Sequence, residues 1–535
     1  MPLDMPIATP VKHIARSRNK TAPAHTTEDV HNHSTVPMLA HQRQRLTASP
    51  SERAHIDAVL AELQYATYWR AFRLADLPPE IMTHILRLAA WSTATPAEAV
   101  MARLNLTWVS RNLRRAAISD CTLWNALWIT DRAPYARTRA WLDRAGSAPL
   151  DIRFDETDPR YKARTALDEA GAEVLLSALR PKLAQLRMVI VVLRNVQAAQ
   201  AVMRAVENAA PVGMERYEVH CAGRPFVSPE HGAWGEREFD RHGTTPIFCG
   251  GRLQHLALNG VHVNWARSPI SNLQSLDLRR MSLSSSPSLI QFRAMLSACP
   301  QLSKLALDGI GPQVDVNLAR TLHPIVLPNV KTFLIGDFSL PYALYVLSQL
   351  RVPNVRDLTL MNLTDEDYTP LFATLTGQMK EVRLLTLYTI DVAPVGASRP
   401  TLVSWLRAMP LVRYLRIAQL QSYVFEALLD DPTYASEYPS PPPSPDPSSD
   451  SNHLAREVLC PQLNCLEFQH VSNNAVITVC EGRKELRRPL RTIYVNPLWA
   501  QDMQDEEVQR LKKVAEKVAV VDAYTTLEEW LAVQD

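Results

Sequence analysis

Glycine is scarce in this sequence, and its scarcity bears on catalysis. Only 16 of the 535 residues are glycine, so the close backbone approach that phosphate-binding loops require is poorly provided for. The sequence contains no glycine-rich phosphate loop, nucleophile elbow, HExxH pattern or paired-carboxylate constellation. Cys249 before two glycines and His220 beside Cys221 are isolated, with no identifiable group to orient them. We therefore expect a non-enzymatic protein with no catalytic residue and no cofactor.

Cysteine is also rare, and its spacing excludes two classes of small domain. The seven cysteines are dispersed and form no CxxC pair, which argues against a disulfide framework and against a zinc module. An odd, scattered set fits a reducing compartment, so we expect an intracellular protein, cytoplasmic, nuclear or both. Four histidines near the N-terminus lack a rigid scaffold, and we interpret them as part of a solvated tail with no metal. They are His25, His31, His33 and His41.

Long apolar runs and a strong charge of either sign are missing too. The longest apolar runs, such as Val189–Leu193, are far too short to cross a bilayer. The N-terminus has no continuous apolar segment, so no secretory signal is expected. A formal net charge of +2 gives no reason to expect nucleic acid or a membrane as partner. A chain of 535 residues, 46% of them hydrophobic, predicts several domains or an elongated repeat array.

The N-terminal region contains a polar tail followed by helical patterns. Residues 1–50 are polar and aperiodic, and we expect them to be disordered. Over 51–75 the apolar residues recur at spacings of three, four and seven, which predicts a leading helix. A strong helix start follows at Leu77-Pro78-Pro79-Glu80-Ile81, because proline is tolerated in a first turn and Glu80 suits the positive end of the helix dipole.

Three further apolar groups complete a compact helical module over residues 76–130. Leu77, Ile81, Ile85 and Leu88 share one helical face, which could equally be the internal core of the module. A second helix is expected to carry Leu106, Val109 and Leu113, after a polar connection. Bulky residues then recur at helical spacing, and we expect the two tryptophans among them to belong to the core of the module. These residues are Leu123, Trp124, Leu127 and Trp128.

Segments of this module resemble the F-box family. The stretch LPPEIMTHIL from Leu77 to Leu86 is similar to its opening helix, and VSRNLRRAA from Val109 to Ala117, followed by LWNAL, is similar to its closing segment. The leading helix, the polar insert and WLDRAGSAPL from Trp141 to Leu150 resemble the F-box-like domains of mushroom-forming fungi. The likeness covers about 100 residues. One departure is Leu113, which stands where the family often has tryptophan.

The resemblance implies a role in ubiquitin ligation. It implies that the module docks the Skp adaptor, and through it a cullin scaffold, while partner subunits carry out the ligase chemistry. Two alternatives stay open: a leucine-rich-repeat scaffold that has no ligase coupling, and an enzyme whose site assembles only in three dimensions. The residues that the resemblance assigns to adaptor binding are Leu77, Pro78, Ile81, Ile85, Leu86, Val109 and Leu113.

A repeat runs through the rest of the chain. Apolar residues occur at positions i, i+3, i+5 and i+8 in nine copies, which begin at residues 253, 273, 302, 330, 355, 382, 412, 463 and 490. Weaker copies begin at Leu186 and Met214. By subtraction the steps are 20, 29, 28, 25, 27, 30, 51 and 27 residues, and most match a leucine-rich repeat of one strand and one helix.

Loops and helices are expected between the repeated strands. The step of 51 encloses a Pro/Ser-rich stretch at about 431–453, which we expect to loop out. Its Ser444-Pro445 pair could be phosphorylated, although a solvated linker is the simpler interpretation. Helical stretches are predicted around Leu289 and Leu402. A proline precedes several strands by two residues, where it ends the preceding helix; these are Pro300, Pro328, Pro353, Pro410 and Pro461.

The predicted fold class is α/β: a small helical F-box-like module followed by a leucine-rich-repeat solenoid over residues 131–500, with parallel strands inside, helices outside and a capping segment over 501–535. The commonest repeat form has Asn or Cys three residues after the last strand leucine. Here that position is apolar, as at Val261, Met281 and Ile310. The turn must satisfy its backbone in another way, so we expect an irregular horseshoe.

Strand residues between the core positions are predicted to line the concave face. They include His255, Ala257, Asp277, Arg279, Lys304, Thr359, Tyr388, Tyr414, Arg416, Glu467 and Tyr494. Because tyrosine and arginine are common anchors at binding surfaces, our candidates for contact with an unknown protein partner are Tyr388, Tyr414, Arg416 and Tyr494. An ordinary solvated sheet face is the equal alternative.

Overall fold

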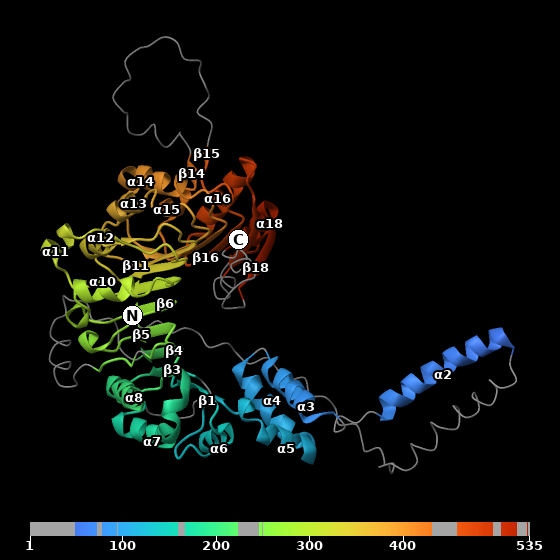
Figure 1. Ribbon diagram of the computed structural model, residues 1–535. Helices are drawn as coiled ribbons and strands as arrows, with labels where there is room; N and C mark the ends of the chain where they lie inside the picture. The colour runs from blue at the N-terminus through green and yellow to red at the C-terminus, as the bar shows by residue number, and fades with distance from the viewer. Residues whose placement is uncertain are drawn as a thin grey trace, which may run out of the picture.

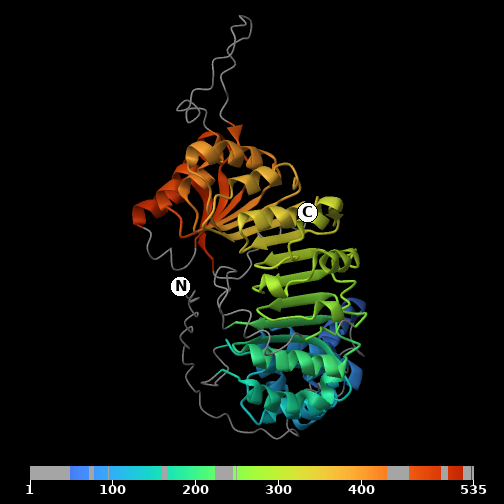
Figure 2. The ribbon, with the colours of Figure 1, turned by 90° about the vertical axis from the view of Figure 1, so that its left-hand side faces the viewer.

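The structure is a computed structural model, and it describes residues 49–71, 77–93, 95–158, 166–222, 245–248, 250–430, 457–495, 504–521 and 532. Figure 1 shows the helical module at one end of a curved stack of strands, with most helices on the outer side of the curve. Figure 2 shows the strands stacked one above another along the molecule. The expected tail over residues 1–50 lies almost entirely outside the described residues, as do the four N-terminal histidines, Cys249 and the Ser444-Pro445 pair.

The N-terminal helices begin where the sequence provides caps or prolines. α2 (Pro50–Ala71) corresponds to the predicted leading helix. α3 (Pro79–Trp91) begins at the predicted proline, with Glu80 in its first turn. The side chain of Thr95 accepts a hydrogen bond from the backbone of Glu98 at the start of α4 (Pro96–Val109). Ser110 caps α5 (Arg111–Ser119) in the same way.

The four bulky residues after α5 do not continue the helical module, which corrects their predicted helical spacing. Cys121–Leu123 forms the short 3-10 turn η2, and Ala126–Ile129 forms strand β1. Trp124 is buried as expected, packed edge to face on Trp141 with ring centroids 5.3 Å apart. Leu127 and Trp128 point to opposite sides of the strand, because side chains alternate along extended backbone. The spacing of residues 123, 124, 127 and 128 fits a helix. In the structure, however, Ala126–Ile129 is a strand that pairs along its whole length with β2.

Fourteen described strands form one parallel sheet in chain order. The paired strands run in register, so equivalent residues of successive repeats stack in straight rows. This order confirms the predicted solenoid with parallel strands. The strands are β1 (Ala126–Ile129), β2 (Leu150–Asp155), β3 (Leu186–Leu193), β4 (Arg216–Cys221), β5 (His255–Asn259), β6 (Ser275–Arg279), β7 (Lys304–Asp308), β9 (Thr332–Gly336), β11 (Asp357–Leu363), β12 (Leu384–Ile390), β13 (Tyr414–Ala418), β16 (Cys465–Gln469), β17 (Leu490–Val495) and β18 (Ala515–Val520).

The sheet extends past both predicted limits of the solenoid. It begins at Ala126, before the expected boundary at residue 131, and ends at Val520, past the expected boundary at residue 500. The segment expected to be a cap contains one more helix and strand, α18 (Asp505–Val514) and β18, and β18 pairs with β17. Its strand carries charged residues and none of its side chains is fully buried, so it lacked the repeated pattern that identified the other strands.

The i+3 and i+5 residues of the repeat form two continuous core rows. One row includes Leu256, Leu276, Leu305 and Phe333, and the next includes Leu258, Leu278, Leu307 and Ile335; all are fully buried. All nine sequence copies coincide with strands, and so do the two weaker copies at β3 and β4. Burying two or three aliphatic side chains per repeat, at about 1.5–3 kcal/mol each, is the main stabilising contribution of the pattern.

The turn after each strand satisfies its backbone by pairing with the next repeat. The residue two positions after the last core leucine has a positive φ, as at Gly260, Arg280, Gly309 and Asp337. Its N–H donates to the carbonyl of the following repeat: Gly260 to Arg279 at 2.9 Å and Arg280 to Asp308 at 2.7 Å. This continuous backbone ladder replaces the side-chain bond that asparagine makes in the commonest form, and it leaves the next position free to be apolar.

The outer side of the solenoid is irregular. Predicted helices around Leu289 and Leu402 are confirmed as α10 (Leu289–Ser297) and α14 (Val395–Arg407), whereas η5 (Trp265–Arg267) and η6 (Leu283–Ser285) are only single turns. The remaining outer elements are α6 (Ala136–Ala145), α7 (Glu169–Leu179), η3 (Arg180–Gln185), α8 (Val196–Ala209), α11 (Val316–Thr321), α12 (Leu340–Ser348), α13 (Thr369–Leu375), α15 (Ser422–Glu426), α16 (Asn473–Glu485) and the paired short strands β8 (Ile325–Val326) and β10 (Leu350–Arg351).

A small antiparallel pair of strands brackets the Pro/Ser-rich segment. β14 (Leu429–Asp430) pairs with β15 (Glu457–Val458), so the chain leaves and rejoins the solenoid at neighbouring points. Arg399 donates to the carbonyl of Leu429 at 2.8 Å and holds the pair against α14. The predicted loop at 431–453 falls between these strands and lies outside the described residues.

Candidate docking surfaces

Helix α3 has two apolar faces, and only one of them is buried. Met82, Leu86 and Ala90 pack in the core of the module, at no more than 7% exposure. Ile81, Ile85 and Leu88 lie on the opposite side at 49%, 37% and 58% exposure. Burying such a face removes water from apolar surface, so an exposed stripe of three large aliphatic residues on one helix is an unusual feature of a folded chain.

Neighbouring helices also expose large apolar side chains. Trp108 and Val109 at the end of α4 are 65% and 67% exposed, and Met101 and Ile118 on α4 and α5 are exposed as well. Together with the α3 stripe and Trp91 they form what we call the module's exposed apolar set. Sequence reasoning identified Ile81, Ile85 and Val109 of this set. It missed Trp91, Met101, Trp108 and Ile118, because an apolar residue on a helix normally signals a buried face.

Two of the residues assigned to adaptor binding are buried, which corrects that part of the assignment. Leu86 is 2% and Leu113 is 9% exposed, and both belong to the continuous core. Leu86 follows Ile85 by one residue, and a step of about 100° turns it to the inner face. Leu113 lies beside Ala117 on the inner face of α5. Pro78 is exposed and Leu77 is partly buried against the core.

A buried arginine joins the module to the first repeat. Arg103 of α4 is 2% exposed and donates to the carbonyls of Ala99, Leu123 and Ala126. Its guanidinium lies 4.8 Å from the ring centroid of Trp91 and 4.5 Å from that of Trp141. Burial lowers its pKa to about 10, which leaves it charged at neutral pH. The module and the solenoid therefore share one core and one polar joint.

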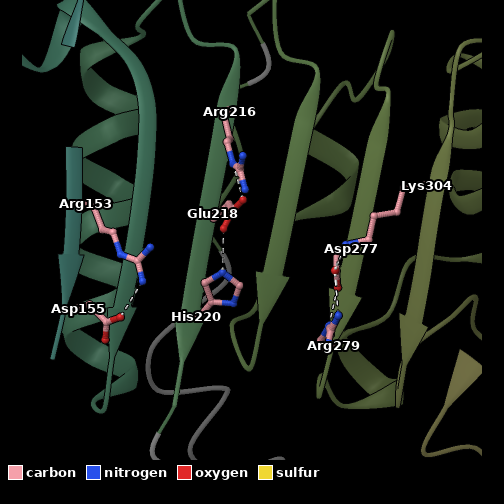
Figure 3. Close-up of polar contacts among 8 residues, drawn as sticks. All are labelled: Arg153, Asp155, Arg216, Glu218, His220, Asp277, Arg279 and Lys304. Carbon is pink, nitrogen blue, oxygen red and sulfur yellow. Dashed lines mark hydrogen bonds and ion pairs between the residues drawn. The ribbon is translucent and has the colours of Figure 1, made fainter. Parts of the chain in front are cut away.

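The concave face of β2 to β7 carries alternating acids and bases (Figure 3). Glu218 accepts hydrogen bonds from Arg216 and, at 3.3 Å, from His220 on the same strand. Asp277 accepts hydrogen bonds from Arg279 at 2.6 Å and from Lys304 of the next strand at 3.0 Å. On β2, Arg153 bonds Asp155 at 3.2 Å. This surface, which we call the charged ladder, presents fixed positive and negative groups in nearly equal number.

The ionisation of the charged ladder follows from these contacts. Burial alone would raise the pKa of Glu218, but the hydrogen bond from His220 and the charge of Arg216 lower it. The pKa of Asp277 is likewise lowered by Arg279 and Lys304 against the effect of burial. Both carboxylates are therefore charged at neutral pH. Among these residues, the sequence analysis placed Asp277, Arg279 and Lys304 on the concave face. The residues of β2 could have been found from the alternation of apolar and polar residues in LDIRFD.

The four predicted partner-contact residues divide into two groups. Tyr388 and Arg416 lie on the concave face and are partly exposed, and Arg416 donates to Glu467 at 2.9 Å. Tyr414 and Tyr494 are only 0% and 7% exposed, which corrects their assignment as accessible anchors. The hydroxyl of Tyr414 donates to Glu467 at 2.6 Å. Both tyrosines pack in a small apolar cluster separate from the main core.

The isolated chemical candidates have structural roles. His220 bonds Glu218, and Cys221 is buried with its thiol near the carbonyl of Arg194. No cluster of three or more His, Cys, Asp or Glu able to hold a metal occurs within the described ranges. Among the helices that the structure describes, none combines the length and the hydropathy needed to cross a membrane.

Comparison with known proteins adds one structural likeness. No protein-family model matches the sequence, and no curated protein matches it. Among solved structures, the chain is similar to the leucine-rich repeat-containing protein LegL7 from Legionella pneumophila, with 10% identity and a TM-score of 0.27. That match covers 76% of this chain and 96% of LegL7. The assignment of the leucine-rich-repeat fold rests on the strand rows and turn ladder described above.

Proposed function

We propose that this protein is a substrate receptor of an SCF-type cullin ubiquitin ligase. The helical module docks the Skp adaptor, and the solenoid binds the protein to be modified. The observation that carries the proposal is the exposed stripe Ile81, Ile85 and Leu88 on the helix that resembles the opening helix of an F-box. A stripe that packed inside the module would have removed the reason for the proposal.

The remaining contacts fit a receptor that contributes position rather than chemistry. Arg103 and the shared core hold the module at a defined place relative to the first repeats. A receptor of this kind raises the local concentration of its target near a reactive partner, which accounts for the lack of a catalytic constellation in the sequence. The concave charged ladder and the residues around Tyr388 are the surfaces offered to the target.

Substitution of the stripe tests the adaptor interaction. Ile81→Asp and Ile85→Asp in the full chain place a carboxylate in the interface, and each is expected to weaken Skp adaptor binding at least ~100-fold, or about 2.7 kcal/mol. Ile290→Asp is the matched control, because Ile290 is an exposed isoleucine on the solenoid helix α10; it should bind as the parent chain does. Affinity is measured by calorimetry with purified adaptor, and folding by circular dichroism.

Two outcomes would contradict the proposal. Undiminished binding by folded Ile81→Asp would mean that the stripe is not the docking surface. Lack of adaptor binding by the folded parent chain would leave a leucine-rich-repeat scaffold without ligase coupling. Leu113, which stands where the F-box family often has tryptophan, favours this alternative.

A further inference from the structure

Four basic residues stack at the edge of the sheet where the strands begin. They are Lys331, Arg356, Arg383 and Arg413, and each lies one residue before its strand, β9, β11, β12 and β13. The backbone N–H of Arg356, of Arg383 and of Arg413 donates to the carbonyl of the preceding member, at 2.8, 2.8 and 2.7 Å. We call these four residues the basic column. Because neighbouring strands lie about 4.8 Å apart, the column is about 14 Å long.

The basic column is limited to four neighbouring strands. The same backbone bonds join Lys331 to Ser303 at 2.7 Å and Asn464 to Arg413 at 3.1 Å, so the residues that flank the column are uncharged. All four members of the column are partly exposed. Like charges placed opposite one another on neighbouring strands repel, and a bound anion relieves this repulsion.

Two members of the column have positive charge that the described part of the chain leaves unpaired. No hydrogen bond or ion pair joins the side chain of Lys331 or Arg383 to another described residue, and Nη1 of Arg383 is buried there without a hydrogen-bond partner. In the charged ladder, by contrast, basic groups pair with carboxylates of the ladder itself. The basic column is therefore better suited than the charged ladder to hold an anionic ligand.

Partly exposed apolar side chains lie on the concave face of the same strands. They are Leu334 of β9, Met361 of β11 and Tyr388 of β12. Met361 is in register with Tyr388, and its side chain lies over Gly336, where an added Cβ would be 2.7 Å from Cγ of Met361. Leu334 is three residues from the basic column, which is about 10 Å along the strand. A ligand held by the column can therefore also contact an apolar surface.

The opposite edge of these strands is acidic, which favours a peptide over a nucleic acid. Asp337, Asp365 and Asp391 follow β9, β11 and β12 within two residues. A nucleic acid wide enough to reach both edges brings its phosphates to these carboxylates, which repel them. A single peptide is narrow enough to keep its acidic residues on the basic side, and its aliphatic or aromatic side chains fit the apolar surface.

We propose that the basic column binds an acidic segment of a partner protein, and that an apolar side chain of this segment packs on Leu334, Met361 and Tyr388. An apolar centre beside a charged rim is the usual anatomy of a protein docking surface. Complementary charge accelerates association and makes it sensitive to salt. The inference gives the chemical class of the target, and it rests on the proposed function only where it identifies the partner as that target.

Peptide binding by the full chain tests the proposal. The probe is a fluorescein-labelled peptide of seven glutamates with one central phenylalanine, and affinity is measured by fluorescence anisotropy at low salt. Lys331→Glu and Arg383→Glu should each weaken binding at least ~5-fold, because they replace an attraction by a repulsion. Arg383→Lys keeps the charge and should bind as the parent chain does. Arg320→Glu is the matched control, since Arg320 is an exposed arginine on the outer helix α11.

Three outcomes would overturn the proposal. One is lack of peptide binding by the folded parent chain. Another is equal weakening by Arg320→Glu, which would mean that net charge alone attracts the peptide. The third is tighter binding of a short oligothymidylate than of the peptide, which would assign the column to a nucleic acid. Ile81→Asp should bind the peptide as the parent chain does, so a failure of adaptor docking is distinguished from a failure of this inference. Circular dichroism verifies the folding of each variant.

Discussion

At the residue scale, Asp308 is the most unusual ionisable group of the concave side. It is the last residue of β7 and only 5% exposed. Burial, followed by the neighbouring carboxyl of Asp337, raises its pKa to about 7, against the opposing charges of Arg279 and Arg280. The protonated form of Asp308 is thus favoured in the folded chain, in contrast to Asp277 one strand away, whose pKa is lowered.

A pH dependence of stability follows from this raised pKa. Between about pH 4 and pH 7 the unfolded Asp308 loses its proton while the folded one retains it, so its contribution to stability falls as pH rises, by up to about 1.4 kcal/mol per pH unit. Asp308→Asn should remove this loss. Its stability relative to the parent chain should therefore be greater at pH 8 than at pH 5. Urea midpoints of both chains at the two pH values measure the effect.

Asp277→Asn provides the control of opposite sign. The lowered pKa of Asp277 stabilises the fold above the unfolded value and that stabilisation is lost as pH falls through the folded pKa. Asp277→Asn should therefore be less stable than the parent at neutral pH. Equal pH profiles for Asp308→Asn and the parent would show that Asp308 is ionised in the fold at neutral pH.

At the element scale, the backbone turn after each strand defines the repeat more regularly than the outer helices do. Its left-handed residue is glycine after β5 and β7, and Arg280, Asp337 and Asn362 adopt the same conformation after or within β6, β9 and β11. A side chain at such a φ costs roughly 1–2 kcal/mol. The ladder bond to the next repeat, which Arg280 and Asp337 make, offsets part of that cost.

Gly260 tests the turn. Its φ is +67°, and an added Cβ would lie 3.1 Å from the carbonyl oxygen of Cys221. Gly260→Ala is expected to lower the free energy of unfolding by at least about 1 kcal/mol, measured by urea denaturation. Gly213→Ala is the matched control, because its Cβ would meet no atom within 4 Å. A Gly260→Ala chain as stable as Gly213→Ala would refute a strained left-handed turn.

At the scale of the whole molecule, a single hydrophobic core runs from α3 to α18. The helical module is therefore the first layer of the solenoid rather than a separate domain on a linker. Trp141 of the first repeat packs on Trp124 and on Arg103, which joins it to α4. In a solenoid each unit contacts only its neighbours, so this joint determines how the exposed stripe of α3 is oriented to the concave face.

The Pro/Ser-rich segment should be dispensable for the fold. Residues 431–456, 26 residues by subtraction, connect β14 to β15. Replacing them with four Gly/Ser residues should preserve the structure and stabilise it by about 1.5 kcal/mol, because a shorter loop loses less entropy on closure. Thermal unfolding and Skp adaptor binding of the two chains provide the measurement. A lower melting temperature in the shortened chain would mean that this segment makes stabilising contacts.

Several features were predictable because their causes are local. The core rows follow from apolar residues spaced three and five apart, and the start of α3 follows from its prolines. The single helix expected to carry Leu106, Val109 and Leu113 was wrong, because Ser110 ends α4 and caps the start of α5. β1, β2 and β18 were missed because their apolar residues lack the full repeated pattern. The bonds of the turn ladder join residues about one repeat apart, so the sequence indicated only that an alternative to asparagine was needed.

By itself the sequence determined the parallel solenoid and the existence of a helical module, since both depend on periodicities that each segment carries alone. The tertiary structure decided which face of α3 is exposed, because Ile81, Ile85 and Leu88 are as apolar as Met82, Leu86 and Ala90. It also decided that Tyr414 and Tyr494 are covered. Ala532, a residue distant in sequence, packs in one cluster with both tyrosines, and no local pattern specifies a contact between segments so far apart.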